Sequence, residues 1–421
     1  MTIEVSRLNN GFTVATDRMD HVETAAVGVW VGIGARHETP QLNGVSHMLE
    51  HMAFKGTARR SAQEIVNQVE SVGGQINAYT SRENTAYYLR VLAVDVGLAV
   101  DILADILQNS TFEAEELERE RAVILQEIGQ CTDTPDDLIF DQFQETAYPD
   151  QAIGRSILGT ADNVRSLDRA ALDGYMRGNY GADRMVLAAS GKVDHGKILR
   201  LAEDAFGALA ASDVPAPEPA AYRGGQHAEQ RDLEQLHLVL GFDGLAYQDP
   251  DFYTMSVLSS VLGGGMSSRL FQEVRERRGL VYSIYTFNTA YQDGGLFGLY
   301  AGTGADQVGE LMPVVMEQLF SIGDTVSSEE IDRVKAQLRA GLLMALENTR
   351  ARAERLGQHL LIFGRPIPVE EIVERIDAVD AAAIGRLANR VFAGVPTLAA
   401  LGPVGPLDRL AGWTARPNAA E

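Results

Sequence analysis

Residues 186–193 read VLAASGKV, and residues 397–404 read TLAALGPV, 211 positions further along the chain. Two further pairs of segments keep the same order and nearly the same spacing: residues 96–97 and 308–309 at an offset of 212, and residues 115–119 and 329–333 at an offset of 214. One short match arises by chance, but three in one order indicate a long internal repeat. The sequence therefore predicts two homologous domains of about 210 residues each.

The segment between the two repeats has the composition of a linker. Residues 211–230 read ASDVPAPEPAAYRGGQHAEQ, are rich in Pro, Ala and Gly, and show no apolar period. A chain of 421 residues is also long enough for two or three domains. We expect one domain at 1–210, a linker at 211–230 and a second domain at 231–421.

Each half mixes strand and helix patterns. Apolar residues at every second position of residues 25–33 predict a strand, and helical spacing begins at residue 43. Further strands are expected at 84–91, 184–193, 236–242, 281–288, 295–301 and 397–401, and helices at 43–55, 96–107, 114–131, 252–262, 305–322 and 328–347. Strand pairs beside helical runs favour α+β domains, each a mostly antiparallel sheet packed with helices.

Charge and composition exclude several classes of protein. The net charge of −22 argues against a general nucleic-acid binder, because phosphate binding needs clustered Lys and Arg, but it allows a basic peptide partner. The single cysteine, Cys131, rules out an internal disulfide framework. Residues 1–10 lack the apolar core of a secretory signal, and no run of 18 apolar residues predicts a membrane span. We expect a cytoplasmic protein, and a mature organellar protein would have the same composition.

Residues 47–51 read HMLEH and carry the strongest chemical signal. On a helix, His47 and His51 lie one turn apart on the same face, where two imidazoles can share one metal ion. Glu50 lies beside them, where its carboxylate can reach a water on that metal. This H-x-x-E-H order is that of the inverted zincins. The alternative is a solvated polar helix face that carries two histidines.

A catalytic zinc takes three protein ligands and a water, so a third ligand is expected on another element. The helix predicted at 114–131 and the residue before it supply six candidates: Glu113, Glu115, Glu116, Glu118, Glu120 and Glu127. Glu120 and Glu127 are two turns apart and share a face, with the apolar residues 122–125 between them. A carboxylate in an apolar stretch is unusual unless it is paired or ligating, and spacing alone does not decide between these two roles.

HMLEH followed 76 residues later by Glu127 in ERERAVILQE resembles the pitrilysin-type zinc metallopeptidases, in the branch of mitochondrial processing peptidase. The resemblance covers nearly the whole chain and includes GIGARHE (32–38), HMAFKGT (51–57), INAYTSRENTAYY (76–88) and LGGGMSSRLFQEVRERRGLVYS (262–283). It implies the fold of the LuxS and processing-peptidase metallopeptidases.

The resemblance also implies the site. One zinc ion per chain would be held by His47, His51 and Glu127, with Glu50 as the general base that takes a proton from the attacking water. Glu120 would support the site from outside the ligand set.

The second half lacks the zinc motif, since residues 258–262, which lie 211 positions after it, hold no histidine or carboxylate. This half carries Arg275 and Tyr282 in VRERRGLVY. The resemblance implies that both contact the substrate near the scissile bond, where they could stabilise an oxyanion. The alternative is a solvated basic helix end, because Arg277 and Arg278 lie beside Arg275.

Two more segments resemble parts of the family. Asn77 and Ala78 match its edge strand, which pairs backbone to backbone with the peptide, and the alternative is an ordinary core strand. Residues 263–265 (GGG) match its flexible glycine-rich loop, and the surrounding spacing is not that of a phosphate-binding motif. The remaining histidines show no ligand spacing and are expected to be structural or surface residues: His21, His37, His195, His227, His237 and His359.

The leading hypothesis is a zinc endopeptidase that cuts extended, unfolded peptides inside a two-domain chamber. One alternative is a non-catalytic core or regulatory subunit of a processing-peptidase-like complex, and another is a peptide-binding chaperone with a structural zinc. Non-catalytic relatives commonly lose a ligand or the base, whereas this chain keeps both, and a structural zinc does not need Glu50.

The partners follow from the same reasoning. Because the zinc motif and the Arg275/Tyr282 element occur in one chain, a homodimer is expected, and a heteromeric partner stays open. The negative charge predicts a preference for basic peptides. Glu83 and Glu120 lie near the motif and are candidates to face such a substrate.

Overall fold

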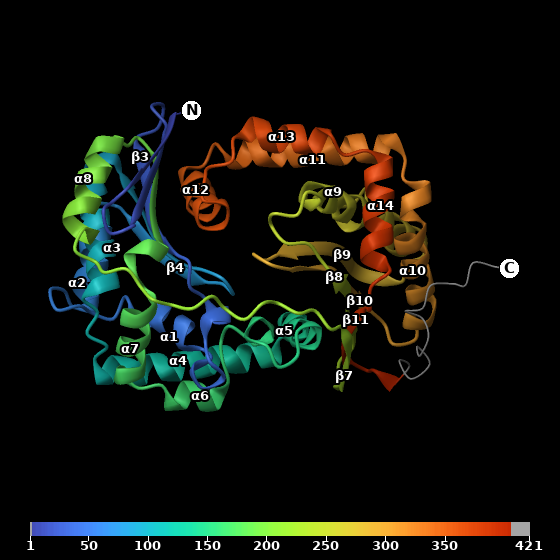
Figure 1. Cartoon of the computed structure of the whole chain (residues 1–421). Helices are drawn as coiled ribbons and strands as arrows, with labels where there is room; N and C mark the ends of the chain where they lie inside the picture. Colours follow the sequence, from blue (N-terminus) through green and yellow to red (C-terminus); the bar gives the residue numbers. More distant parts are fainter. Residues whose placement is uncertain (1, 406–421) are drawn as a thin grey trace. The chain divides into compact units, whose positions relative to one another are not determined.

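The computed structural model describes residues 2–405 of the chain (Figure 1). The chain forms two compact units, and neither is a single continuous segment. Unit 1 comprises Met1–Gln130, Arg155–Glu218 and Leu342–Ile367, and unit 2 comprises Cys131–Gly154, Pro219–Gly341 and Pro368–Glu421.

Unit 1 contains a six-stranded sheet in the order β1-β2-β6-β3-β5-β4. β2 and β6 are parallel, and the other neighbouring strands are antiparallel. The strands span Thr2–Arg7 (β1), Thr13–Arg18 (β2), Thr24–Val31 (β3), Gln75–Thr80 (β4), Thr85–Leu92 (β5) and Met185–Gly191 (β6). The helices span Val45–Met52 (α1), Ala62–Ser71 (α2), Val96–Gln108 (α3), Ala114–Asp133 (α4), Ala161–Ser166 (α6), Arg169–Asn179 (α7), His195–Phe206 (α8) and Thr349–Phe363 (α12).

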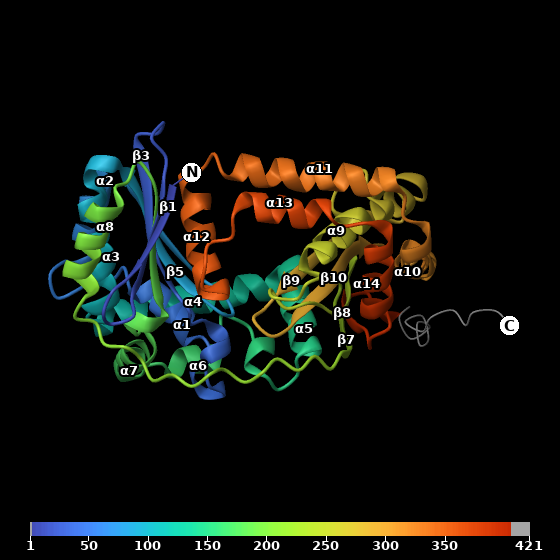
Figure 2. The ribbon, with the colours of Figure 1, turned by 45° about the horizontal axis from the view of Figure 1, so that its top comes forward.

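Both faces of the unit 1 sheet are buried. Along β3, Val27 and Val29 belong to the core beneath α3 and α8, whereas Ala26 and Trp30 belong to a second core beneath α12. This alternation follows from the two-residue period of a strand. Figures 1 and 2 show α3 and α8 on one face of the sheet and α12 on the other. A strand with two buried faces reads as a nearly continuous apolar run, which is how β3 reads.

The contact between α12 and the sheet is close. Trp30 is 1% exposed, and Gly357 of α12 lies directly over its ring. A Cβ at position 357 would be 2.4 Å from the Cδ2 atom of Trp30. Only glycine therefore allows the helix backbone to approach the indole at this point.

Unit 2 contains a five-stranded sheet in the order β7-β11-β8-β10-β9, in which β7 and β11 are parallel and the other neighbours antiparallel. The strands span Gly225–Gln230 (β7), Leu236–Asp243 (β8), Val281–Ala290 (β9), Gly295–Thr303 (β10) and Thr397–Gly402 (β11). The helices span Pro135–Ala147 (α5), Phe252–Gly263 (α9), Val308–Thr325 (α10), Ser328–Ala345 (α11), Val369–Asp377 (α13) and Ala381–Phe392 (α14).

The unit 2 sheet repeats the topology of five of the six strands of the unit 1 sheet. β2-β6-β3-β5-β4 of unit 1 and β7-β11-β8-β10-β9 of unit 2 share the strand order and the position of the parallel pair. The repeated sequences lie in corresponding elements, because β6 and β11 carry the first pair, α3 and α10 the second, and α4 and α11 the third. The predicted α+β class with mostly antiparallel sheets is confirmed.

Each half of the chain contributes one helix to the sheet formed mainly by the other half. α5 packs on β8 and β11 of unit 2, and α12 packs on β3 and β6 of unit 1. The exchanged segments, Cys131–Gly154 and Leu342–Ile367, begin 211 positions apart, the offset of the strand repeat. The compact units therefore do not coincide with one cut through the predicted linker. Its last six residues also form β7, so the extended segment ends at residue 224.

Within the described residues 2–405, no helix is both long and apolar enough to cross a bilayer.

Candidate metal centre

Helix α1 presents the HMLEH motif on its less buried face. Met48, Leu49 and Met52 are fully buried in the core, whereas His47, Glu50 and His51 are only partly buried. The spacing of the apolar residues thus turns the two imidazoles and the carboxylate away from the core and toward α4.

The start of α1 is fixed by a carboxylate from outside the helix. Gly44, with a φ of +99°, provides no side-chain cap. The buried carboxylate of Glu38 instead accepts hydrogen bonds of 2.8 Å from the backbone N–H of Gly44 and of Ser46. A negative charge on the free N–H groups of a first turn stabilises the helix at that end.

Helix α4 brings Glu127 to the two histidines. Its Oε2 atom lies 3.6 Å from Nε2 of His47 and 3.7 Å from Nε2 of His51. One ligand atom from each of these three residues lies within 4.8 Å of the others, which makes them a candidate metal site among the described residues.

This donor set fits zinc. Bonds of about 2.0–2.2 Å in a tetrahedral site place the ligand atoms roughly 3.4 Å apart, close to the two separations from Glu127. Two imidazoles and one carboxylate also leave the fourth position open, as in catalytic zinc sites. Burial lowers the pKa of His47 to about 4, with a smaller contribution from the charge of His51. His47 is therefore neutral at pH 7, the form that binds metals.

Glu120 lies behind His51. Its Oε2 atom is 2.9 Å from Nδ1 of His51, and its Oε1 atom is 2.6 Å from the ammonium of Lys55. Burial alone would raise the pKa of Glu120, but the hydrogen bonds from Lys55 and His51 outweigh it and lower the pKa. An ionised carboxylate at Nδ1 keeps that nitrogen protonated and leaves Nε2 free to bind a metal. The sequence predicted Glu120 at this place, and it did not predict Lys55.

Glu50 lies next to the ligands and is partly buried. Burial raises the pKa of its carboxyl group. Hydrogen bonding to Thr80 at the end of β4 and the charge of His51 lower it, the charge of Glu127 raises it, and the net shift is upward. A carboxylate with a raised pKa is a better proton acceptor, which suits a general base.

Strand β4 forms the edge of the unit 1 sheet, with β5 as its neighbour, and it carries Asn77 and Ala78. Ala78 is 9% exposed, whereas Asn77 is exposed and its Oδ1 accepts a hydrogen bond of 2.7 Å from the N–H of Ala78. The hydroxyl of Tyr79 accepts hydrogen bonds from Trp30 and from Gln358 of α12. These bonds attach β4 to β3 and to α12. β4 has a strand neighbour on one side only, and a further strand that hydrogen-bonds to the Ala78 N–H would replace its bond to Asn77.

Arg275 and Tyr282 lie in unit 2, whereas the candidate ligands lie in unit 1. The Arg275 guanidinium is 4.8 Å from the centre of the Phe271 ring and 5.6 Å from that of Tyr282. Its neighbours Arg277 and Arg278 form ion pairs with Glu273. Among the described residues, no carboxylate lies within 4.0 Å of the Arg275 guanidinium. Tyr282 is 76% exposed. Arg275 and Tyr282 thus differ from Arg277 and Arg278, both of which are paired with Glu273.

Glu83 and Glu120 were expected to face a substrate, but each is paired with a cation of the chain itself. Glu83 is buried against Arg36 at 2.6 Å, and Glu120 is occupied by Lys55 and His51. The remaining histidines form no cluster with the spacing of a metal site in residues 2–405. His195 and His237 hold hydroxyl groups of Thr16 and Tyr300.

Two family models match the chain. The model described as insulinase (peptidase family M16) matches residues 13–161, and that of the peptidase M16 inactive domain matches residues 166–338. Among the relatives, an "uncharacterized zinc protease" of Rickettsia felis is 41% identical over 95% of this chain and 97% of its own length. A probable mitochondrial-processing peptidase subunit beta of Arabidopsis thaliana is 39% identical over 95% of this chain and 78% of its own length.

A solved structure shares the fold. The crystal structure of a protease from Helicobacter pylori matches 96% of this chain and 99% of its own with a TM-score of 0.89, at 23% identity. This similarity confirms the predicted fold.

Proposed function

Because this chain belongs to peptidase family M16, we propose that it is a zinc endopeptidase that hydrolyses extended, unfolded peptides. The observation that carries the proposal is the convergence of His47, His51 and Glu127 from two helices, with Glu50 beside them. A bound zinc ion would supply Lewis-acid chemistry, which lowers the pKa of a water ligand to about 7 and polarises a carbonyl.

The residues of the chain would supply proton transfer, orientation of a ligand and binding of the peptide. Glu50 accepts the proton of the attacking water and later delivers it to the leaving amine. Glu120 holds His51 in the tautomer that presents Nε2. The free edge of β4 binds the peptide backbone at Asn77 and Ala78 and thereby requires an extended substrate.

We assign Arg275 and Tyr282 a role in substrate contact near the scissile bond. The exposed phenol and a guanidinium without a carboxylate partner among the described residues are available to hydrogen-bond an oxyanion. This assignment rests on the family resemblance and on the environment of the pair within unit 2.

The alternative is a non-catalytic core or regulatory subunit of a processing-peptidase-like complex. The complete set of ligands and Glu50 disfavours it. The experiment that separates the two compares zinc content and peptide cleavage in the wild type, in Glu50→Gln and in Glu127→Gln. We expect about one zinc per chain in the wild type, retained zinc with activity lower by orders of magnitude in Glu50→Gln, and lost zinc in Glu127→Gln. Wild-type activity in Glu50→Gln would contradict the mechanism.

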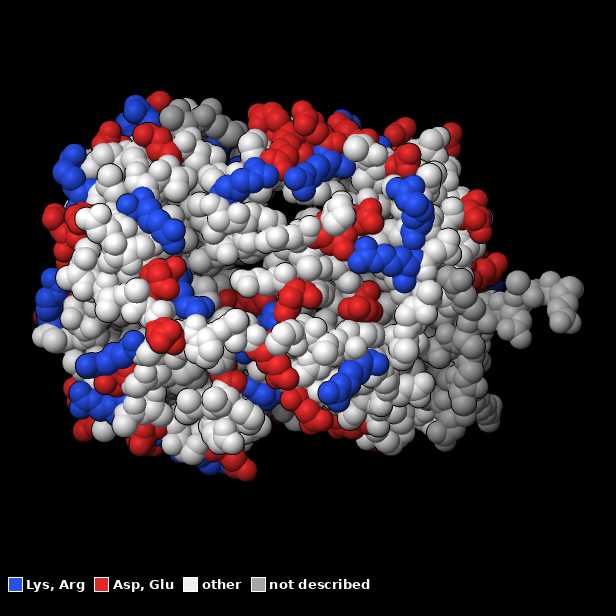
Figure 3. Space-filling view, viewed as in Figure 1, with Lys and Arg blue, Asp and Glu red and all other residues white. Residues whose placement is uncertain are grey.

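We further propose a homodimer, because one chain carries both the candidate zinc site and the Arg275/Tyr282 element. The substrate would be basic, since the net charge is −22 and acidic side chains gather over α13, whose first turn carries Glu370 and Glu371 (Figure 3). Arg-rich peptides should have a higher kcat/KM than matched Glu-rich peptides at low salt. The difference should shrink at about 1 M salt, where the Debye length is about 3 Å.

A further inference from the structure

Lys55 follows the end of α1, and its ammonium forms an ion pair with Glu120, the residue behind His51. Its ammonium is 2.6 Å from Oε1 of Glu120, and the other carboxylate oxygen is 2.9 Å from Nδ1 of His51. Each oxygen of one carboxylate thus serves a different partner. The Lys55 and Glu120 side chains are 29% and 9% exposed. Hydrogen bonds between charged groups are stronger and more directional where water is largely excluded.

The two histidines are oriented differently. Nδ1 of His51 is held by Glu120, whereas Nδ1 of His47 is buried and has no hydrogen-bond partner among the described residues. Of the two histidines, only His51 is therefore oriented through its Nδ1 by a hydrogen bond from the described residues, and the partner in that bond is the Glu120 carboxylate. Whatever fixes that carboxylate also fixes the direction of the His51 ring.

The backbone around Lys55 is pinned to the end of α3. The N–H of Ala58 donates to the carbonyl of Asn109 at 3.0 Å, and the N–H of Thr111 donates to the carbonyl of Gly56 at 3.2 Å. Gly56 has a φ of +117°, which turns the chain directly after Lys55. This short pairing leaves the loop little freedom to carry Lys55 away from Glu120.

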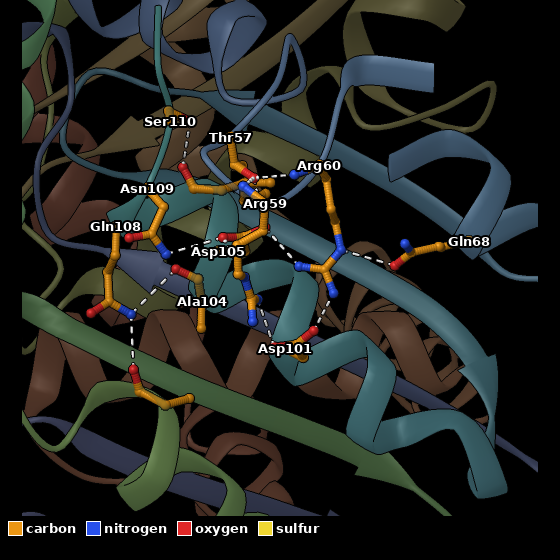
Figure 4. Close-up of polar contacts among 12 residues, drawn as sticks. Thr57, Arg59, Arg60, Gln68, Asp101, Ala104, Asp105, Gln108, Asn109 and Ser110 are labelled. Carbon is orange, nitrogen blue, oxygen red and sulfur yellow. Dashed lines mark hydrogen bonds and ion pairs between the residues drawn. The ribbon is translucent and has the colours of Figure 1, made fainter. Parts of the chain in front are cut away.

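A buried carboxylate strengthens this attachment. Asp105 is completely buried in α3, and its Oδ2 accepts hydrogen bonds from the Thr57 hydroxyl at 2.8 Å and from Arg60 at 2.6 Å. Its Oδ1 accepts from Arg59 and Asn109, both at 3.0 Å. Figure 4 shows the side chains of the loop converging on Asp105. We call these five residues the Asp105 cluster.

We propose that Lys55 is a positioning residue of the metal centre. Held by a loop that the Asp105 cluster anchors, it fixes the Glu120 carboxylate against His51 and thereby increases the affinity for zinc. The inference rests on the proposed function in one respect, namely that zinc is the metal, and it assigns Lys55 no chemical step.

The test is the zinc affinity of Lys55→Met, measured on metal-free protein by competition with a chromophoric chelator. Met keeps the length and the apolar stem of the side chain and removes the charge. We expect the dissociation constant for zinc to rise about 10-fold, the lower end of what the loss of an outer hydrogen-bond partner costs. Simple repulsion between an ammonium and a dication predicts the opposite sign, namely tighter binding by Lys55→Met.

Three variants make the result specific. Lys55→Arg keeps a cation that can reach Glu120 and should restore most of the affinity. Lys192→Met removes another lysine of unit 1 that forms a 2.8 Å ion pair, with Glu23 on the exposed surface, and should leave zinc binding unchanged. In a Glu120→Gln background, Lys55→Met should have no further effect, because its partner carboxylate is already absent.

Unchanged or tighter zinc binding by Lys55→Met would overturn the proposal. So would an equal loss in Lys192→Met, or a full additional loss in the Glu120→Gln background. A wild-type protein that binds no zinc would contradict the proposed function itself. Melting curves of the metal-free variants separate a local effect from unfolding, and Lys55→Arg provides the comparison if Lys55→Met folds poorly.

Discussion

Arg352 of α12 donates hydrogen bonds to both carboxylate oxygens of Asp17 on β2, at 3.1 and 3.0 Å, across 335 residues of sequence. The two side chains are 8% and 2% exposed. Arg352 also donates to the backbone carbonyl of Leu346 just before α12. A buried ion pair therefore joins a helix from late in the chain to a strand near its start.

The first prediction concerns this pair. Arg352→Met leaves Asp17 buried without its cation, so we expect the free energy of unfolding to fall by about 3 kcal/mol. Adding Asp17→Asn to Arg352→Met should recover part of the loss, because the uncompensated charge is removed. Arg177→Met, which breaks an exposed ion pair with Asp173, should change stability by less than about 0.5 kcal/mol. Denaturant unfolding measures all three, and equal stability of Arg352→Met and Arg177→Met would contradict the prediction.

The second prediction uses two helical glycines of unit 1. Gly357→Ala places a methyl group against the Trp30 ring, and we expect a loss of about 1–3 kcal/mol as α12 moves away from the sheet. Gly174→Ala on α7 meets no atom within 4 Å and should stabilise by about 0.5–1 kcal/mol through helix propensity. Melting temperatures should shift in opposite directions, and a shift of the same sign would show that the α12 contact is not tight.

The third prediction concerns pH. Burial lowers the pKa of His37 to about 4, against 6.5 in the unfolded chain, and its Nδ1 accepts a hydrogen bond from the Gly34 N–H, as only an unprotonated ring nitrogen can. Between pH 6.5 and 4 the unfolded chain therefore binds a proton that the folded protein does not, and stability falls as the pH falls. His37→Gln retains an acceptor and cannot titrate.

We expect the stability of the wild type, relative to His37→Gln, to decrease by up to about 3 kcal/mol over that interval and to level off below pH 4. Urea unfolding at several pH values measures the difference. The same substitution at the exposed His21 controls for the change of side chain. If the difference in unfolding free energy between the wild type and His37→Gln does not vary with pH, His37 does not have the lowered pKa.

The fourth prediction tests the element in unit 2 and rests on the proposed function. Tyr282→Phe removes one hydroxyl and keeps the ring beside Arg275, so packing should be retained. Loss of an oxyanion donor should lower kcat by about 10²-fold, with zinc content unchanged. Tyr285→Phe on the same strand should have little effect. If Tyr282→Phe has the kinetics of the wild type, the Tyr282 hydroxyl does not contribute to catalysis, and the prediction is wrong.

Local patterns predicted much of the fold and the histidine pair, whereas the family resemblance singled out Glu127 among the carboxylates of α4. Apolar spacing identified α1, α3 and α4, and the HMLEH spacing holds because both histidines belong to one helix. Glu127 does not lie in the apolar surroundings that its sequence neighbours suggest. Its side chain is 37% exposed and the neighbouring Val123 is also exposed, whereas the buried carboxylate of α4 is Glu120.

Contacts between distant segments were not predictable. The exchange of α5 and α12 has no local signal, because the apolar face of a helix does not indicate which sheet it covers, and each of these helices packs on strands that are distant in sequence. Arg352 reads as a surface cation, since only its distant partner Asp17 makes burial tolerable. Lys55 was visible within HMAFKGT, but its role depends on a contact with Glu120, 65 residues away.

The exchanged helix α12 also sets an order of events during synthesis. His47, His51 and Glu127 have all been made by residue 127, yet the segment that completes unit 1 ends at Ile367, 149 residues after Glu218. At about 5–20 residues per second, a ribosome needs roughly 7–30 s for that interval. Meanwhile the sheet face that carries Trp30 lacks its cover and can bind chaperones or other nascent chains. A nascent chain thus holds every candidate zinc ligand, and every strand of the unit 1 sheet, well before it holds the helix that covers the Trp30 face of that sheet.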